Sequence, residues 1–312
     1  MHESSSAPGE QPDLQQQLEK KVEPLTPGLA AKEERRMRLQ ELLEPTIIKD
    51  PIAEREDLTA AYALLQRQFR PEELEDLSVF VREMQSNAVP GSLTRYIMAI
   101  RKLRQMVIGM VYASAQVTPS EGITAIRFTV IDREHRGAFI NRAPEGMLLG
   151  EARKFCESKG KALTVIVAEA VDASESYANK IRIEPGNGMR RLYYPDTTDE
   201  MHYELPPLAW NRDGTLAKEG MMEHLQIAIA ECEEAIPVAR LTDILRCWWA
   251  QWYIRPQEDF DSVDAWFTHT QWVWRVLDEK ILVPLQQCTF LEPLSAGQRK
   301  KRETDLYLGE NI

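Results

Sequence analysis

One unit of the sequence constrains the fold more than any other, and it runs strand, turn, helix, strand. Residues 123–132 (ITAIRFTVID) alternate apolar and polar side chains, which is typical of a half-buried strand. Residues 162–170 (ALTVIVAEA) form a short β-branched run, typical of a strand inside a sheet. The segment between them is amphipathic at helical spacing, with Pro144 suited to its first turn and Gly160 to the position past its end. Since the two strands are joined through one helix, we predict that they run parallel in one sheet.

More elements surround this unit. We expect a strand at residues 45–52, two amphipathic helices after it, and an antiparallel hairpin formed by residues 95–101 and 106–115. After residue 170, the sequence GMRRLYY (188–194) suggests one or two helical turns. Two further strands are expected at EMHYELPPL and MMEHLQIAIA, which begin at residues 200 and 221.

The sequence from Ile236 onward is predicted to be helical and carries six of the seven tryptophans. Spacing at three and four residues favours packing as their role over a cofactor platform, and a dimer contact is the second option. The short basic run at 295–303 (SAGQRKKRE) reads as a solvated tail. Two apolar stripes are expected in this region, one of Leu241, Ile244, Leu245, Trp248, Trp249 and Trp252, the other of Val263, Trp266, Phe267, Val273, Trp274 and Leu277.

Charge and composition exclude several classes of protein. The net charge of −11 argues against nonspecific nucleic-acid binding, whose affinity comes from neutralising phosphates. No apolar run approaches the roughly 20 residues that span a bilayer, so no membrane partner is expected. The four cysteines lack CxxC or zinc-type spacing, so we expect no metal and reduced thiols in a cytoplasmic protein.

Two stretches carry a family resemblance. Residues 128–137 (FTVIDREHRG) look like the end of a fourth strand followed by an arginine–glycine signature. Residues 190–208 (RRLYYPDTTDEMHYELPPL) lead into a sixth strand that ends in a Tyr-x-x-Pro-Pro-Leu run starting at Tyr203. In these stretches and in the order of elements, the chain resembles the GNAT N-acetyltransferase superfamily, the second stretch being common in one bacterial branch. The resemblance covers roughly residues 45–230.

The resemblance implies a fold and a cofactor. The expected fold is an α/β mixed sheet, GNAT-like, splayed between its fourth and fifth strands, with acetyl-CoA or another acyl-CoA bound in the resulting V as co-substrate. A backbone N–H near Thr129 or Val130 would meet the thioester carbonyl. Arg136 and Gly137 match the signature of the turn whose N–H groups hold the pyrophosphate beside a helix N-terminus.

The turn departs from the family pattern in its length. No second glycine follows Gly137 at the family's spacing. Either several residues are inserted before the helix, or the loop is rebuilt around Arg142 and Gly146. Asn141, Arg142 and the N–H groups of the first helical turn remain candidates for phosphate contacts, although Pro144 has no N–H to offer.

Acyl transfer to an amine also needs an acid and a base. The resemblance assigns protonation of the leaving thiolate to a tyrosine after the fifth strand, which here is Tyr193 or Tyr194. Glu169, at the end of the fifth strand, is the candidate base or water-ordering carboxylate, with Asp172 as an alternative. A carboxylate in a buried cleft has a raised pKa, which suits a base near neutral pH.

Together these features predict three regions: a polar, flexible segment at 1–43, a GNAT-like acyltransferase domain at 44–235, and a helical, Trp-rich extension at 236–312. The predicted function is N-acyl transfer from acyl-CoA to an amine of a small molecule or peptide, by direct attack in a ternary complex. The alternative is a catalytically inactive scaffold of the same fold whose helical C-terminus binds partners or a second copy in a homodimer.

Overall fold

The computed structural model describes residues that belong to one unit, Leu43–Ile312. The predicted flexible segment at 1–43 lies outside the described residues, apart from Leu43. The ranges described are 43–69, 71, 74–135, 142–171, 190–197, 199–204, 210–215, 224–230, 235–294 and 296–309.

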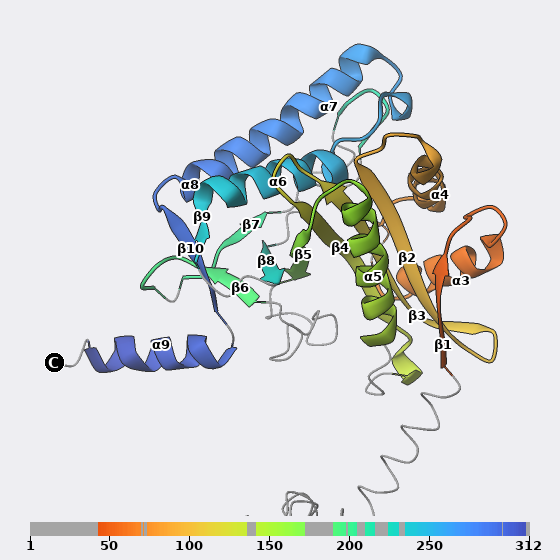
Figure 1. Ribbon diagram of the computed structural model, residues 1–312. Helices are drawn as coiled ribbons and strands as arrows, with labels where there is room; N and C mark the ends of the chain where they lie inside the picture. Colours follow the sequence, from red (N-terminus) through yellow and green to blue (C-terminus); the bar gives the residue numbers. More distant parts are fainter. Residues whose placement is uncertain are drawn as a thin grey trace, which may run out of the picture. The chain divides into compact units, whose positions relative to one another are not determined.

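The described strands form one mixed sheet in the order β1-β2-β3-β4-β5-β8-β6-β10-β9, with β7 paired to β8 (Figure 1). Among the described pairings, β4 and β5 are parallel and all others antiparallel, so the parallel pair predicted from the strand–helix–strand unit is confirmed. The strands are β1 (Leu43–Ile48), β2 (Thr94–Leu103), β3 (Met106–Val117), β4 (Gly122–Ile131), β5 (Leu163–Val171), β6 (Arg190–Tyr193), β7 (His202–Glu204), β8 (His224–Ala230), β9 (Ile236–Pro237) and β10 (Phe290–Leu294).

Helices cover both faces of this sheet, as expected for a mixed α/β fold. Side chains from alternate positions of β2, β3 and β4 pack either with α5 or with α3 and α4, which places α5 on one face and α3 and α4 on the other. Helix α6 packs on the same face as α3 and α4, over β4 and β5. The helices are α3 (Arg55–Gln66), α4 (Leu77–Gln85), α5 (Arg142–Ser158), α6 (Val238–Tyr253), α7 (Val263–Val276), α8 (Val283–Leu285) and α9 (Ala296–Gly309).

The α5 face is packed with small apolar side chains, which allows the helix to approach the sheet closely. Ala99, Ala113 and Ala115 of the strands face Ala152 of the helix. Gly122 marks the tightest contact, because a Cβ there would lie 2.5 Å from the Cys156 sulfur and 2.9 Å from the Ala162 carbonyl oxygen. The start of β4 therefore requires glycine.

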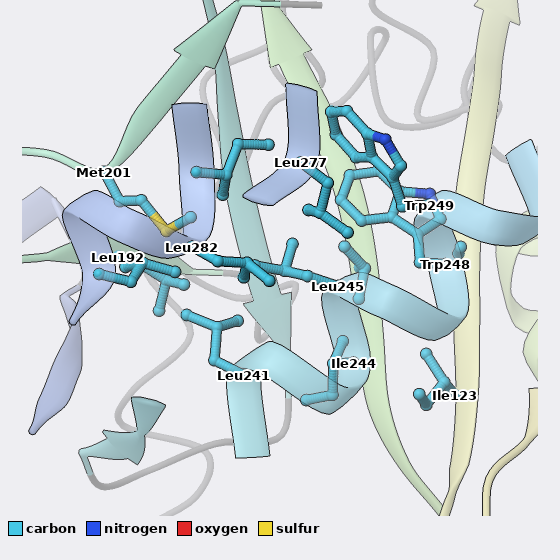
Figure 2. Close-up of a cluster of buried hydrophobic side chains, with 14 of the residues drawn as sticks. Ile123, Leu192, Met201, Leu241, Ile244, Leu245, Trp248, Trp249, Leu277 and Leu282 are labelled. Carbon is cyan, nitrogen blue, oxygen red and sulfur yellow. The ribbon is translucent and has the colours of Figure 1, made fainter. Parts of the chain in front are cut away.

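The tryptophan-rich region packs against the sheet. Trp248, Trp249 and Trp252 of α6 are buried in a cluster that includes Ile123 of β4 and Val165 of β5 (Figure 2). The whole predicted α6 stripe is buried, so the packing interpretation is confirmed for these residues. The segment after Ile236 also contributes two strands, β9 and β10, which its helical periodicity did not predict.

Two sequence predictions of local structure were wrong in whole or in part. In the α7 stripe, Val273 and Leu277 are buried as predicted, but Val263 and Phe267 are 56% and 54% exposed, and Ala265 and His269 are buried instead. The polar histidine occupies the core because its ring packs between aromatic rings, as described in the Discussion.

The second error concerns GMRRLYY. Residues 190–193 are strand β6 instead of helical turns, since they pair with β8 on one side and with β10, about 100 residues later, on the other. Partners so distant in sequence override the local helical signal.

Within the described ranges, no helix is both long and apolar enough to cross a membrane. Nor do three or more histidine, cysteine or acidic side chains of the described residues gather as metal ligands would.

Candidate functional site

The pairing between strands β4 and β5 ends halfway along β4. Their parallel register ends at the pair Ile126–Ala168, although β4 continues to Ile131 and β5 to Val171. At the same point the pairing of β4 with β3 shifts by one residue, so that Arg127 is the extra residue of a β-bulge. A bulge bends its strand and re-aims the following residues. The splay that the resemblance implies between the fourth and fifth strands is therefore present in the backbone.

Strand alternation tells which backbone groups face the gap left by β5. The Asp132 N–H donates to the Ile108 carbonyl at 2.8 Å, so the register pair two residues back, Val130 with Met110, also exchanges bonds with β3. The N–H of Thr129 then faces away from β3. Of the two predicted contacts for an acyl carbonyl, Thr129 has its N–H on the side of the gap, and Val130 has its N–H in the β3–β4 ladder.

A short turn and a helix follow β4. Residues Arg133–His135 form a 3-10 turn, η3, in which the His135 ring lies 3.7 Å from Asp132 Oδ1. Helix α5 begins at Arg142, so Arg142 and Gly146 belong to a helix and not to a rebuilt loop. In an α-helix only the first four N–H groups lack an internal acceptor, and Gly146 is the fifth residue.

The signature residues themselves lie in the part of the chain that is not described: Arg136, Gly137 and Asn141, and the alternative base Asp172, are outside the described residues. Their predicted roles stay predictions.

The two candidate tyrosines lie far from the β4–β5 gap in the order of the sheet. Tyr193 ends β6 and is 2% exposed, and Tyr194 follows it, half-buried against the cluster beneath α6 and α7. Strands β8 and β5 intervene between β6 and β4. Burial raises the pKa of Tyr194, with smaller contributions from Cys288 and Asp199. The sheet does not bring either tyrosine beside Thr129.

Glu169, unlike the tyrosines, lies next to the point where β4 and β5 separate. It pairs with Ile227 of β8 and is the first residue of β5 beyond the last β4–β5 pair, Ile126–Ala168. The residue therefore stands at the opening of the splay, as expected for the end of the fifth strand.

Sequence reasoning missed a buried ionic network at the bulge. The Arg127 guanidinium lies 2.6 Å from Glu75 Oε2 and 3.3 Å from Glu83 Oε1. Tyr112 of β3 donates a 2.6 Å hydrogen bond to Glu83 Oε2. The guanidinium also lies over the Trp252 ring of α6, 5.5 Å from its centroid, which is a cation–π arrangement. The available signal was an arginine in the middle of an otherwise buried strand.

The network holds two carboxyl groups and one guanidinium, so its charges do not balance. Burial raises the pKa of Glu83 to about 7; Arg127 opposes this shift and Glu75 adds to it. The same desolvation, followed by the charge of Glu83, raises the pKa of Tyr112 far above its ordinary value. The pKa of Glu83 therefore lies in the neutral range, where the group can gain or lose a proton.

Helix α6 covers this network and makes polar contacts with strands β2 and β3. The Trp252 indole N–H donates to Ser114 Oγ at 3.2 Å, and Cys247 Sγ donates to Gln116 Oε1 at 3.0 Å. Gln251 donates to the hydroxyl of Tyr96, which stacks on Tyr112. The C-terminal region thus shapes the same face of the sheet that holds Glu83.

Comparison with known proteins gives a limited result. No family model matches the sequence, and no curated protein matches it. The chain is similar to solved structures of N-acetyltransferases at low identity, with TM-scores below 0.5 for those described next.

One is the ribosomal-protein-S18-alanine N-acetyltransferase of Escherichia coli, 21% identical over 60% of this chain and 93% of that one, with a TM-score of 0.33. A GNAT-family acetyltransferase of Streptococcus pneumoniae is 16% identical over 60% and 98%, with a TM-score of 0.34. Arabidopsis thaliana Naa50, in complex with a bisubstrate analogue of CoA and a peptide, is 11% identical over 60% and 97%, with a TM-score of 0.35. The sheet order and the strand register of this chain define its fold.

Proposed function

We propose that the chain is an acyl-CoA-dependent N-acyltransferase that transfers an acyl group, acetyl in the simplest case, to an amine of a small molecule or peptide. The amine attacks the thioester carbonyl directly while both substrates are bound. The sequence also predicts that the enzyme is bacterial and cytoplasmic. A homodimer contact, if one forms, is predicted in the helical region.

One observation carries the proposal, the parting of β4 from β5 at Ile126 and Ala168 with the Thr129 N–H on the open side. A preorganised backbone donor at an acyl carbonyl stabilises the negative charge that develops on its oxygen. Helix α5 begins 11 residues after Ile131, the end of β4, and its first N–H groups favour an anion such as a pyrophosphate. Residues 136–141, with Arg136 and Gly137, are the proposed remainder of that phosphate turn.

The remaining chemistry is assigned to the residues of this chain. Glu169 is proposed to order water or to take up the proton of the amine at the opening of the splay. Tyr194, partly exposed, is a better candidate than the buried Tyr193 to protonate the thiolate. For either tyrosine the intervening strands β5 and β8 argue against direct contact with Thr129, so a phenylalanine substitution tests this role separately.

Acetyl-CoA binding tests the proposal. A ligand at about 100 times its dissociation constant stabilises the folded state by roughly 2.7 kcal/mol, which raises the melting temperature by several degrees. We expect such a shift with acetyl-CoA and CoA, and none with pantetheine, which lacks the pyrophosphate. A flat response at millimolar acetyl-CoA contradicts the proposal and supports the scaffold alternative, in which the fold serves only partner binding.

A further inference from the structure

The two faces of the sheet beside the gap are covered by different helices. Helix α5, whose N-terminus follows the proposed phosphate turn, packs on one face of the sheet, while α4 and α6 pack on the other. An acyl-CoA held at the α5 end presents its carbonyl at the Thr129 N–H. That arrangement leaves the face that α4 and α6 cover for the amine.

The ionic network stands on that second face, at the point where the gap begins. Arg127 directly follows Ile126, the last residue of β4 that pairs with β5, and it is two residues before Thr129. Of the three charged side chains in the network, Glu83 is the most exposed, at 13%, compared with 6% for Arg127 and 5% for Glu75. Glu83 is therefore the member of the network that is most accessible from outside.

We propose that Glu83 accepts the proton of the incoming amine, and that the surplus carboxylate of the Glu75–Arg127–Glu83 network selects acceptors that arrive as ammonium cations. This inference rests on the proposed function, and it concerns the same site.

The steps balance. The ammonium N–H bond breaks and its proton passes to a Glu83 carboxylate oxygen. The neutral amine forms a bond to the acyl carbon as the carbon–sulfur bond breaks. The attacking nitrogen then loses its second proton, the departing thiolate takes up one proton to leave as thiol, and Glu83 returns its own proton to solvent. The net products are the amide, free thiol and one proton released to solvent.

The groups facing Glu83 set its protonation. Arg127 of β4 and Arg82 of its own helix favour the carboxylate, as does the hydrogen bond from Tyr112 of β3, while burial and Glu75 favour the acid. Arg82 itself forms a bidentate salt bridge with Asp259 of η5 (Gln257–Asp259), with distances of 2.6 and 3.0 Å between its guanidinium nitrogens and the two carboxylate oxygens. From β2, the Tyr96 hydroxyl also faces Glu83 and remains neutral, since burial raises its pKa.

An arriving ammonium group adds the missing cation. It favours the Glu83 carboxylate over its protonated form. Binding of the amine and readiness to accept its proton are thereby coupled, because the ionised form of Glu83 is the form that can act as base.

The kinetic test compares Glu83→Gln with the wild type in acetyl transfer from acetyl-CoA to spermidine and to an alanine-initiated tetrapeptide. We expect the wild-type rate to rise through pH 7 and the variant to lose this limb together with about a hundredfold in kcat. The KM for acetyl-CoA and its thermal shift should not change. Glu121→Gln is the matched control, because Glu121 is also a largely buried carboxylate paired with an arginine, Arg240, but lies before the start of β4.

A second measurement needs no turnover. Calorimetry of spermidine binding to the CoA-saturated chain at pH 7, in phosphate and in Tris buffer, reports the protons released. The wild type should release a fraction of a proton that Glu83→Gln does not release. A Glu83→Gln variant that keeps the rate and the pH limb overturns the inference, as do equal heats in both buffers or no binding of spermidine. Loss of the acetyl-CoA thermal shift in the wild type is a different result, which overturns the proposed function itself.

Discussion

Glu83 and His269 are both buried ionisable side chains, and their surroundings differ in kind. Glu83 lies among charges and hydroxyls, between Arg127 and Tyr112. His269 lies among rings, 4.4 Å from the Trp210 centroid and 4.9 Å from that of Phe260, and its Nε2 accepts the Arg255 N–H at 3.1 Å.

The difference separates a group that is ready to exchange a proton from one that is not. Burial lowers the pKa of His269 to about 4, with a further contribution from Arg255, so the ring is neutral at physiological pH. The pKa of Glu83, about 7, lies where a small change of charge nearby alters its protonation. Both groups are buried, and what distinguishes Glu83 is an unbalanced charge beside it together with a pKa near neutral pH.

The largest expected effect comes from removing the cation of the network. Arg127→Met leaves Glu75 and Glu83 buried without a counter-charge, so we expect a loss of about 3–5 kcal/mol in the free energy of unfolding at pH 8. The loss should shrink at pH 5, where the carboxyl groups can take protons. Urea unfolding at both pH values measures it, with Arg82→Met, in a more exposed pair, losing only about 1 kcal/mol. Equal losses for the two variants would contradict a special role for Arg127.

The two buried groups should impose opposite pH dependences on stability. The raised pKa of Glu83 makes the folded state bind more protons than the unfolded state between pH 4.5 and 7, so its contribution falls as pH rises. The lowered pKa of His269 makes the unfolded state bind more protons between pH 4 and 6.5, so its contribution falls as pH falls. Each contribution reaches about 3 kcal/mol.

Substitution separates these opposing slopes. From pH 4.5 to 7, stability should rise more steeply with pH in Glu83→Gln than in the wild type, and less steeply in His269→Gln. Chemical denaturation at intervals of half a pH unit resolves the slopes. If both variants follow the wild-type curve, neither group has the protonation described for it.

A smaller effect should come from Gly214, which holds the loop carrying Trp210 against α7. Its φ is +84°, and a Cβ there would lie 2.5 Å from the Ala265 carbonyl oxygen. Gly214→Ala should therefore cost about 2 kcal/mol and raise the pKa of His269 towards its ordinary value, because the ring loses its cover. NMR titration of the imidazole checks this shift, and Gly91→Ala, at a similar φ of +81° with no neighbour within 4 Å, controls for backbone strain.

The smallest effect concerns the cap of the helix that carries His269. Ser262 Oγ accepts the Ala265 N–H at 3.1 Å as the N-cap of α7. Ser262→Ala should lower the free energy of unfolding by about 1 kcal/mol without changing the pH limb assigned to Glu83. A change in that limb would mean that the two regions are coupled.

The sequence predicts the parts of the fold whose partners are near in the chain. The hairpin of β2 and β3 and the parallel pair of β4 and β5 follow from strand alternation and a single connecting helix. Strands β6 and β10 could not be predicted in this way. Their pairing joins Tyr193 to Glu292, about 100 residues later, and such a distant pairing produces no periodic pattern in the local sequence.

The candidate site likewise contains residues that the sequence could place and residues that it could not. The family resemblance, applied to the predicted strands, placed Thr129 and Glu169 at the ends of adjacent strands, and the backbone agrees on that placement. The network escaped notice because Glu75 and Glu83 precede or belong to a helix whose polar residues look solvated, and only tertiary packing brings them to Arg127. Helical spacing likewise favoured Phe267 over His269 for the core, since it does not register the rings of Trp210 and Phe260.

The place of β10 in the sheet has a consequence for biosynthesis. Residues Phe290–Leu294 lie between β6 and β9, so β6 has an open edge until a ribosome has released them. Exposed strand edges are sites of wrong pairing between chains. A nascent chain stalled before residue 290 would present that edge to its neighbours on a polysome, and a chaperone that binds extended segments would find its substrate there.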